Sequence, residues 1–381
     1  LLVFGPTSLV GAQVLLGAVV MSALLLRLCR GLPDRGLALT ILFVAALPWY
    51  LLHSVKWPQS IAASLLILGL LLLERTCRTS SIGPAVAAGF VFGCALYFRS
   101  EFLYFQLFLV VAVVLASKIV KVPLVPLRAT IISALTSLLV LLPWAIHFYR
   151  ETGRISFRAS NGGMVAFVSL GQLPGNPWGA SFRDEYAYEY LKNRGVAYSA
   201  LSSEGDLVLF DEFKRRVQAE PYAFGRKIIR NAIVTVIGGF YNGELPLSPN
   251  ESEQVARLRQ SFKALVTSPV ETVEGPFTAR VYSAFAYWVA LKALGALFVL
   301  VSLAGLLASL VRPKPSPLLF LLALLVIYQL LLLVFLSTEP RHLNGLFPAL
   351  VPFFVVALSQ LPRLKIAKPW TVHFVRNGSL R

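Results

Sequence analysis

The sequence has little charge for its length. Only 14% of its 381 residues are Asp, Glu, Lys or Arg, against about 25% in typical soluble domains. Hydrophobic residues make up 57%, so too little polar surface is available to cover soluble domains of this size. We therefore expect an integral membrane protein, and the same hydrophobic content excludes an intrinsically disordered chain.

Cysteines are few, and the common catalytic signatures are absent. The three cysteines have no spacing typical of a zinc site or a disulfide framework. His53, His147 and His342 fall at one predicted membrane level but have no ligand spacing either. The sequence has no glycine-rich phosphate loop, dinucleotide fingerprint, Gly-x-Ser-x-Gly or His-Glu-x-x-His. These absences argue against ATP-driven work in this chain. They leave no predicted cofactor, and a divalent metal is only a possibility without sequence support.

Long apolar runs dominate the rest of the sequence. A membrane-spanning helix needs about 20 mostly apolar residues. We predict nine spans, over residues 8–26, 37–53, 58–73, 82–98, 102–117, 129–149, 286–311, 317–337 and 345–361. The predicted fold class is an all-α polytopic membrane protein. Its expected parts are a six-span bundle (1–149), a polar segment (150–285), a three-span bundle (286–361) and a basic tail (362–381).

The long connection 150–285 predicts further helices. Residues 207–217 are amphipathic at helical spacing. Asn250, with Glu253 three positions on, is typical of a helix start. Residues 228–240 are apolar but too short to span, so we expect a buried, interfacial or re-entrant helix there.

The net charge of +17 would suggest a nucleic-acid partner in a soluble protein. In a membrane protein, the Lys and Arg of the short loops set the orientation. These residues gather in alternate connections and the tail, over 27–36, 74–81, 118–128, 312–316 and 362–381. The opposite short connections hold only Lys56, Arg99 and Arg341. We therefore predict that the first set is cytoplasmic, that 150–285 is extracytoplasmic, and that no nucleic acid binds.

Polar residues at the predicted outer ends of spans form the candidate site. They are Lys56, Arg99, Glu101, Arg341 and His342. Arg and Lys bind phosphate, and a lipid phosphate lies at this depth of the membrane. We predict a substrate site for an anionic group. The alternative is that these residues cap short loops and that Glu101 pairs with Arg99.

Asn161-Gly162-Gly163, in the polar segment, allows a tight backbone turn with positive φ. Such a turn would bring backbone N–H groups close to a ligand. Asn161 is therefore a further substrate-binding candidate. The alternative is a turn that binds nothing.

Four stretches of the sequence match the motifs of one protein family, both in their order along the chain and in their predicted outward placement. They are 4–31 (FGPTSLVGAQVLLGAVVMSALLLRLCRG), 96–101 (LYFRSE), 141–163 (LLPWAIHFYRETGRISFRASNGG) and 337–353 (STEPRHLNGLFPALVPF). Together they resemble the membrane-embedded GT-C glycosyltransferases, especially the bacterial family-39 branch similar to dolichyl-phosphate-mannose–protein mannosyltransferases. Ser100, His147-Phe148 and His342 stand where that pattern usually has Pro, Arg-Asn and Tyr.

The resemblance implies a GT-C-like bundle in a bacterial inner membrane. It would transfer a sugar from a polyprenyl-phosphate donor to a glycan, lipid or protein acceptor outside the cytoplasm. Arg341, with Arg99 or Lys56, would hold the lipid phosphate. A carboxylate in the family's first outer loop acts as base or orients the acceptor. We expect that loop N-terminal to Leu1, which leaves Glu101 as the candidate within the chain.

Other function classes also fit the spans and their basic edges. A transporter or flippase for lipid-linked saccharides predicts internal repeats and interrupted mid-membrane helices. Neither is clear in the sequence, and Lys292 is the only ionisable candidate inside a span. An O-antigen-type polymerase or ligase uses similar donors. A non-catalytic membrane scaffold needs no site.

Overall fold

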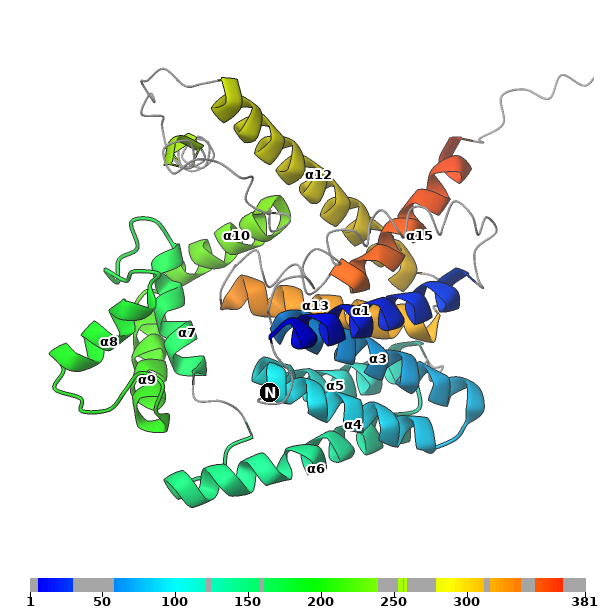
Figure 1. Cartoon of the computed structure of the whole chain (residues 1–381), viewed down its shortest axis with the longest axis horizontal. Helices are drawn as coiled ribbons and strands as arrows, with labels where there is room; N and C mark the ends of the chain where they lie inside the picture. The colour runs from blue at the N-terminus through cyan, green and yellow to red at the C-terminus, as the bar shows by residue number, and fades with distance from the viewer. Residues whose placement is uncertain are drawn as a thin grey trace, which may run out of the picture.

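The structure is a computed structural model. It describes residues 6–29, 58–120, 125–157, 161–238, 253–255, 257–258, 279–311, 316–336 and 347–365. Within these ranges every regular element is a helix (Figure 1), so the all-α prediction is confirmed for them. Each predicted span except 37–53 falls on a helix. The span 37–53 and most of the tail 362–381 lie outside the described residues.

Apolar helices form the main body of the protein, which we call the bundle. They are α1 (Pro6–Cys29), α3 (Pro58–Thr79), α4 (Gly83–Phe98), α5 (Leu103–Val120), α6 (Leu127–Thr152), α12 (Ala279–Leu310), α13 (Pro317–Phe335) and α15 (Phe347–Lys365). The segments long and apolar enough to cross a membrane are Ser100–Ile119, Leu127–Thr152, Val281–Leu310 and Pro317–Phe335. These four mark a membrane protein by length and composition. They do not establish nine spans, because α4 has only 16 residues and α3 carries charge in its last turns.

Glycines allow close approach between bundle helices. A Cβ on Gly89 of α4 would collide with the carbonyl oxygen of Ser133 in α6, and one on Gly93 would meet Val140. In the second half of the chain, a Cβ on Gly305 of α12 would collide with the backbone of Phe353 in α15. Small residues of this kind let backbones pack directly in membrane bundles. The sequence alone did not identify these contacts.

A buried carboxylate joins two helices at the end of the bundle predicted to be cytoplasmic. Glu74 of α3 is 1% exposed. It accepts a 2.6 Å hydrogen bond from Arg27 Nη2 of α1 and pairs with Arg78 Nη2 at 2.9 Å. Because both guanidinium groups reach water, the pair lies at the bundle's rim. Some basic residues that the sequence assigns to connecting loops therefore form ion pairs within the fold.

The polar segment folds into short helices beside the opposite end of the bundle. These are α7 (Gly162–Ser169), the single turn η2 (Leu170–Gln172), α8 (Asp184–Asn193), α9 (Ser203–Ala219) and α10 (Pro221–Gly238). The first three α-helices share a small core that includes Phe167, Leu191 and Leu209. We call residues 161–219 the polar unit. In Figure 1 it lies at the left, where α6 ends, and α10 lies between it and the helices α12 and α13, against which α10 packs.

Two predicted helices of this segment are present. The amphipathic stretch 207–217 lies within α9, which confirms that prediction. The apolar stretch 228–240 lies largely in α10, which begins earlier, at Pro221, since proline suits the first turn of a helix. Asn250 lies outside the described residues, while Glu253 is helical.

Gly89→Ala tests the close approach of α4 and α6. The added Cβ forces the two backbones apart, and overpacking of this kind costs about 1–3 kcal/mol. Gly225→Ala is the matched control, because no atom lies within 4 Å of its Cβ position and alanine improves helix propensity by about 1 kcal/mol. Thermal unfolding of the purified protein in detergent should show a lower midpoint for Gly89→Ala only. An unchanged midpoint for Gly89→Ala would contradict the packing described.

Candidate functional site

A pocket of about 210 Å³ lies where α4 ends, α5 begins and α6 passes beside them. Residues that line it with polar or aromatic groups include Tyr97, Arg99, Glu101, Trp144, Phe157 and Asn161. The structure thus brings together three of the predicted site residues, which are Arg99, Glu101 and Asn161. They come from the α4–α5 junction and from the residue that precedes α7.

Arg99 and Glu101 form an ion pair in the pocket wall. Arg99 donates from Nε at 3.0 Å and from Nη2 at 2.7 Å, and both bonds end on Oε1 of Glu101. The other carboxylate oxygen, Oε2, accepts no hydrogen bond from any residue that the structure describes. The arginine side chain is 17% exposed and the glutamate 37%. The pocket is therefore charge-balanced, and Arg99 is not a spare cation for a phosphate.

The backbone holds this pair at a sharp junction. Arg99 has extended dihedral angles, and its N–H donates to the Ala95 carbonyl at 3.0 Å, which ends α4. The single turn η1 (Ser100–Phe102) follows and leads directly into α5. Tyr328 of α13 donates its hydroxyl to the Glu101 carbonyl oxygen, and its ring lies 5.4 Å from that of Phe105. A residue far along the chain therefore fixes the junction, and sequence spacing gave no signal for it.

Aromatic rings supply the apolar part of the pocket. Trp144 of α6 lines it. Tyr97 donates its hydroxyl to the Val140 carbonyl at 2.9 Å, which ties α4 to α6 beside the pocket. His147 lies one turn beyond Trp144, with ring centroids 6.2 Å apart, but it does not line the pocket.

The backbone after Asn161 is helical and does not form the predicted turn with positive φ. Gly162 and Gly163 are helical and do not have positive φ, so that expectation is wrong. Their role is close packing, because a Cβ on Gly163 would collide with the Asp206 carbonyl of α9. Asp206 Oδ1 accepts hydrogen bonds from the N–H groups of Gly163 at 2.6 Å and Met164 at 3.1 Å. The N–H groups expected to meet a ligand therefore bind α9, and Asn161 reaches the pocket without them.

The remaining predicted site residues are Lys56, Arg341 and His342, and they lie outside the described residues, as does His53. Their predicted roles stay predictions. Among the residues that are described, no group of three or more His, Cys, Asp or Glu side chains could hold a metal ion.

Two polar residues of α10 bind the end of α13. Lys227 is fully buried, and its Nζ donates to the carbonyls of Phe335 at 3.0 Å and Leu336 at 2.8 Å. Asn231 donates to the Val334 carbonyl at 3.1 Å. The last carbonyls of a helix have no intrahelical partner, and a cation is favourable there. The sequence showed α10 only as an apolar stretch and missed this contact.

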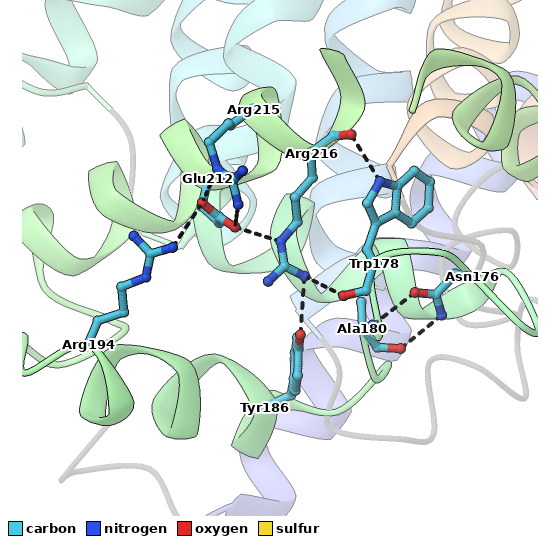
Figure 2. Close-up of polar contacts among 8 residues, drawn as sticks. All are labelled: Asn176, Trp178, Ala180, Tyr186, Arg194, Glu212, Arg215 and Arg216. Atoms are coloured by element: carbon cyan, nitrogen blue, oxygen red, sulfur yellow. Dashed lines mark hydrogen bonds and ion pairs between the residues drawn. The ribbon is translucent and has the colours of Figure 1, made fainter. Parts of the chain in front are cut away.

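A second cluster of charges holds the polar unit together (Figure 2). Glu212 of α9 is 6% exposed. It accepts hydrogen bonds from Arg215 Nη2 at 2.6 Å and Arg216 Nε at 2.7 Å. Arg216 stacks over Phe167, with its guanidinium carbon 4.7 Å from the ring centroid, and donates to the Tyr186 hydroxyl at 3.1 Å. The hydrogen bonds from Arg215 and Arg216 outweigh burial and lower the pKa of Glu212 to about 2.

Acidification tests the contribution of Glu212. Because its pKa falls from 4.5 to about 2 on folding, its stabilisation is complete above about pH 4.5 and is lost as the pH falls towards 2. Glu212→Gln removes this pH dependence, and it costs about 3 kcal/mol near neutrality because buried Arg216 loses its partner. Thermal unfolding of the full chain from pH 6 to pH 3 measures both effects.

Asp211→Asn is the control for this experiment, since Asp211 is 71% exposed in its pair with Lys214. It should leave both the stability and its pH dependence nearly unchanged. An equal loss of stability on acidification in Glu212→Gln and in the unaltered protein would contradict the assignment.

No relative defines the chemistry of the pocket. The chain matches no protein-family model, no curated protein and no solved structure. The residues of the pocket and the helices around it are therefore the basis for assigning a function.

Proposed function

We propose that the protein is a GT-C-type glycosyltransferase. It transfers a sugar from a polyprenyl-phosphate donor to a glycan, lipid or protein acceptor on the extracytoplasmic face of a bacterial inner membrane. The observation that carries the proposal is the pocket in which the Arg99–Glu101 pair lies beside Trp144 and Asn161. A lipid-linked donor keeps its polyprenyl chain in the bilayer and its headgroup at the boundary, and this pocket lies at the end of apolar helices.

The chemistry of the pocket suits a sugar ring. A carboxylate accepts hydrogen bonds from sugar hydroxyls, a guanidinium donates to them and an amide does both, while the Trp144 ring can cover an apolar sugar face. The volume of about 210 Å³ is below the range of about 300–1,000 Å³ for drug-sized ligands. We therefore assign the pocket to the single sugar of the donor, with Glu101 and Arg99 as binding and orienting residues.

The donor phosphate needs a different cation. Because Glu101 neutralises Arg99, the pocket has no surplus positive charge among the residues that the structure describes. We assign the phosphate to Arg341, which the sequence places at the same outer level, with help from Lys56. Positive groups there stabilise the charge that develops on the leaving phosphate.

The proposed reaction is a direct displacement. An acceptor hydroxyl oxygen bonds to the anomeric carbon while the bond from that carbon to the phosphate oxygen breaks, and the configuration inverts. The hydroxyl proton passes to a carboxylate base, and polyprenyl phosphate leaves. Asn161 connects the pocket to the polar unit, so we assign acceptor selection to that unit.

A transfer assay tests the proposal. The full-length protein in liposomes is given labelled polyprenyl-phosphate sugars and a panel of acceptors. Glu101→Gln and Arg99→Gln should each lower the transfer rate about tenfold or more, since a hydrogen bond to a charged group contributes about 1.5–3 kcal/mol. Lys118→Gln, which removes an exposed charge at the far end of α5, should transfer at the normal rate.

The outcomes separate the parts of the proposal. Normal transfer by Glu101→Gln would contradict the role of the pocket, and normal transfer by Arg341→Ala would contradict the phosphate assignment. Movement of the intact lipid-linked sugar across the bilayer, without transfer, would contradict the enzyme and favour a flippase.

A further inference from the structure

The burial pattern of α10 is reversed relative to a helix on a soluble protein. On one face Lys227 and Asn231 are fully buried and Thr235 is 1% exposed. On the opposite face Tyr222 is 80% exposed and Ile229 is 63% exposed. A helix that faces water does the opposite, with its apolar stripe towards the core. The pattern therefore indicates an apolar environment outside α10.

Hydrogen bonds fix the depth of α10 relative to the bundle. Lys227 binds the carbonyl of Phe335, the last residue of a segment apolar enough to span the membrane, and the carbonyl of Leu336 directly after it. Further along α10, Asn231 binds the earlier carbonyl of Val334. Val236, near the end of α10, packs against the hydrophobic core of the bundle. The helix thus begins at the boundary of the span and continues towards the interior of the bundle.

The residues on the exposed face follow the same order. Tyr222 and Arg226 come first, nearest the polar unit, and both are exposed. Ile229 and Ile233 follow towards the bundle, at 63% and 48% exposure. Tyrosine and arginine are favourable at lipid headgroups, and aliphatic side chains at the acyl chains below them. The chemical gradient along α10 therefore matches the gradient across one leaflet.

We propose that α10 lies in the outer leaflet of the bilayer, with Tyr222 and Arg226 among the headgroups and Ile229 and Ile233 against acyl chains. The occupant of this face is lipid rather than protein, because the face is continuous with the apolar helices α12 and α13, against which α10 packs. The positive charge of Arg226 complements lipid phosphate. The proposal depends on the bundle spanning a membrane, and it does not depend on sugar transfer.

This placement gives α10 a mechanical role. Its buried face holds the end of α13, its exposed face binds lipid, and the polar unit precedes it directly in the chain. The polar unit is thereby held at the membrane surface beside the pocket.

Spin labels measure the environment of the exposed face directly. Nitroxides are attached to a single cysteine that replaces Ile229 or Ile233 in the full chain. In this chain the native Cys29, Cys77 and Cys94 are replaced by alanine. The labelled protein is then placed in lipid nanodiscs. The rate at which the nitroxide collides with oxygen, which concentrates in acyl chains, is compared with its rate of collision with a water-soluble nickel complex. The oxygen-to-nickel ratio should be several-fold higher at both positions than at Tyr188→Cys. Tyr188 is the matched control, since it is 41% exposed on α8, on the side of the polar unit away from the bundle (Figure 1).

Two results would overturn the proposal. A ratio at Ile229 and Ile233 equal to that at Tyr188 means that water covers the face. Protection from both reagents means that protein covers it. Should the cysteine replacements prevent folding, a photoreactive benzoylphenylalanine at Ile233 in the otherwise unaltered protein gives the same answer. Adducts with lipid support the proposal, and adducts with protein overturn it.

Discussion

The hydrogen bonds from Lys227 to the last carbonyls of α13 are the contact on which the arrangement of the two parts depends. A helix that ends at a membrane boundary leaves carbonyl groups without intrahelical partners, and unsatisfied polar groups are costly there. Lys227 and Asn231 satisfy three of these carbonyls from a neighbouring helix. The polar unit therefore cannot move away from the bundle unless α10 releases these carbonyls and exposes them.

The same helix, α13, also organises the pocket. Its Tyr328 holds the Glu101 carbonyl, so that one apolar helix positions both the Arg99–Glu101 junction and, through Lys227, the helix that follows the polar unit. Asp206 then fixes the start of α7 beside Asn161. These contacts explain how residues more than 200 positions apart build one pocket with a charge-balanced polar wall and an aromatic wall.

Helix positions were predictable, whereas the contacts between helices were not. Apolar runs of sufficient length predicted the bundle helices, and amphipathic spacing predicted α9. Arg99, Glu101 and Asn161 were singled out because charged or polar residues at the ends of spans are few. The sequence allows the pairing of Arg99 with Glu101 but does not require it, since spacing does not show where a guanidinium points. Gly163 was misread because its sequence fits a turn, while its physical role is the close approach of α7 to Asp206. The polar face of α10 went unnoticed, since a buried lysine is evident only once α13 lies against it.

We expect the pocket and the polar unit to share the membrane face opposite the basic connections. Single cysteines at Glu185 in α8 and at Ser81, between α3 and α4, test it directly, because both positions are exposed. In a background without the native cysteines, intact cells with a permeable outer envelope are treated with a membrane-impermeant thiol reagent. We predict labelling at position 185 without lysis and at position 81 only after the membrane is opened. Labelling at position 81 in intact cells, with position 185 protected, would contradict it.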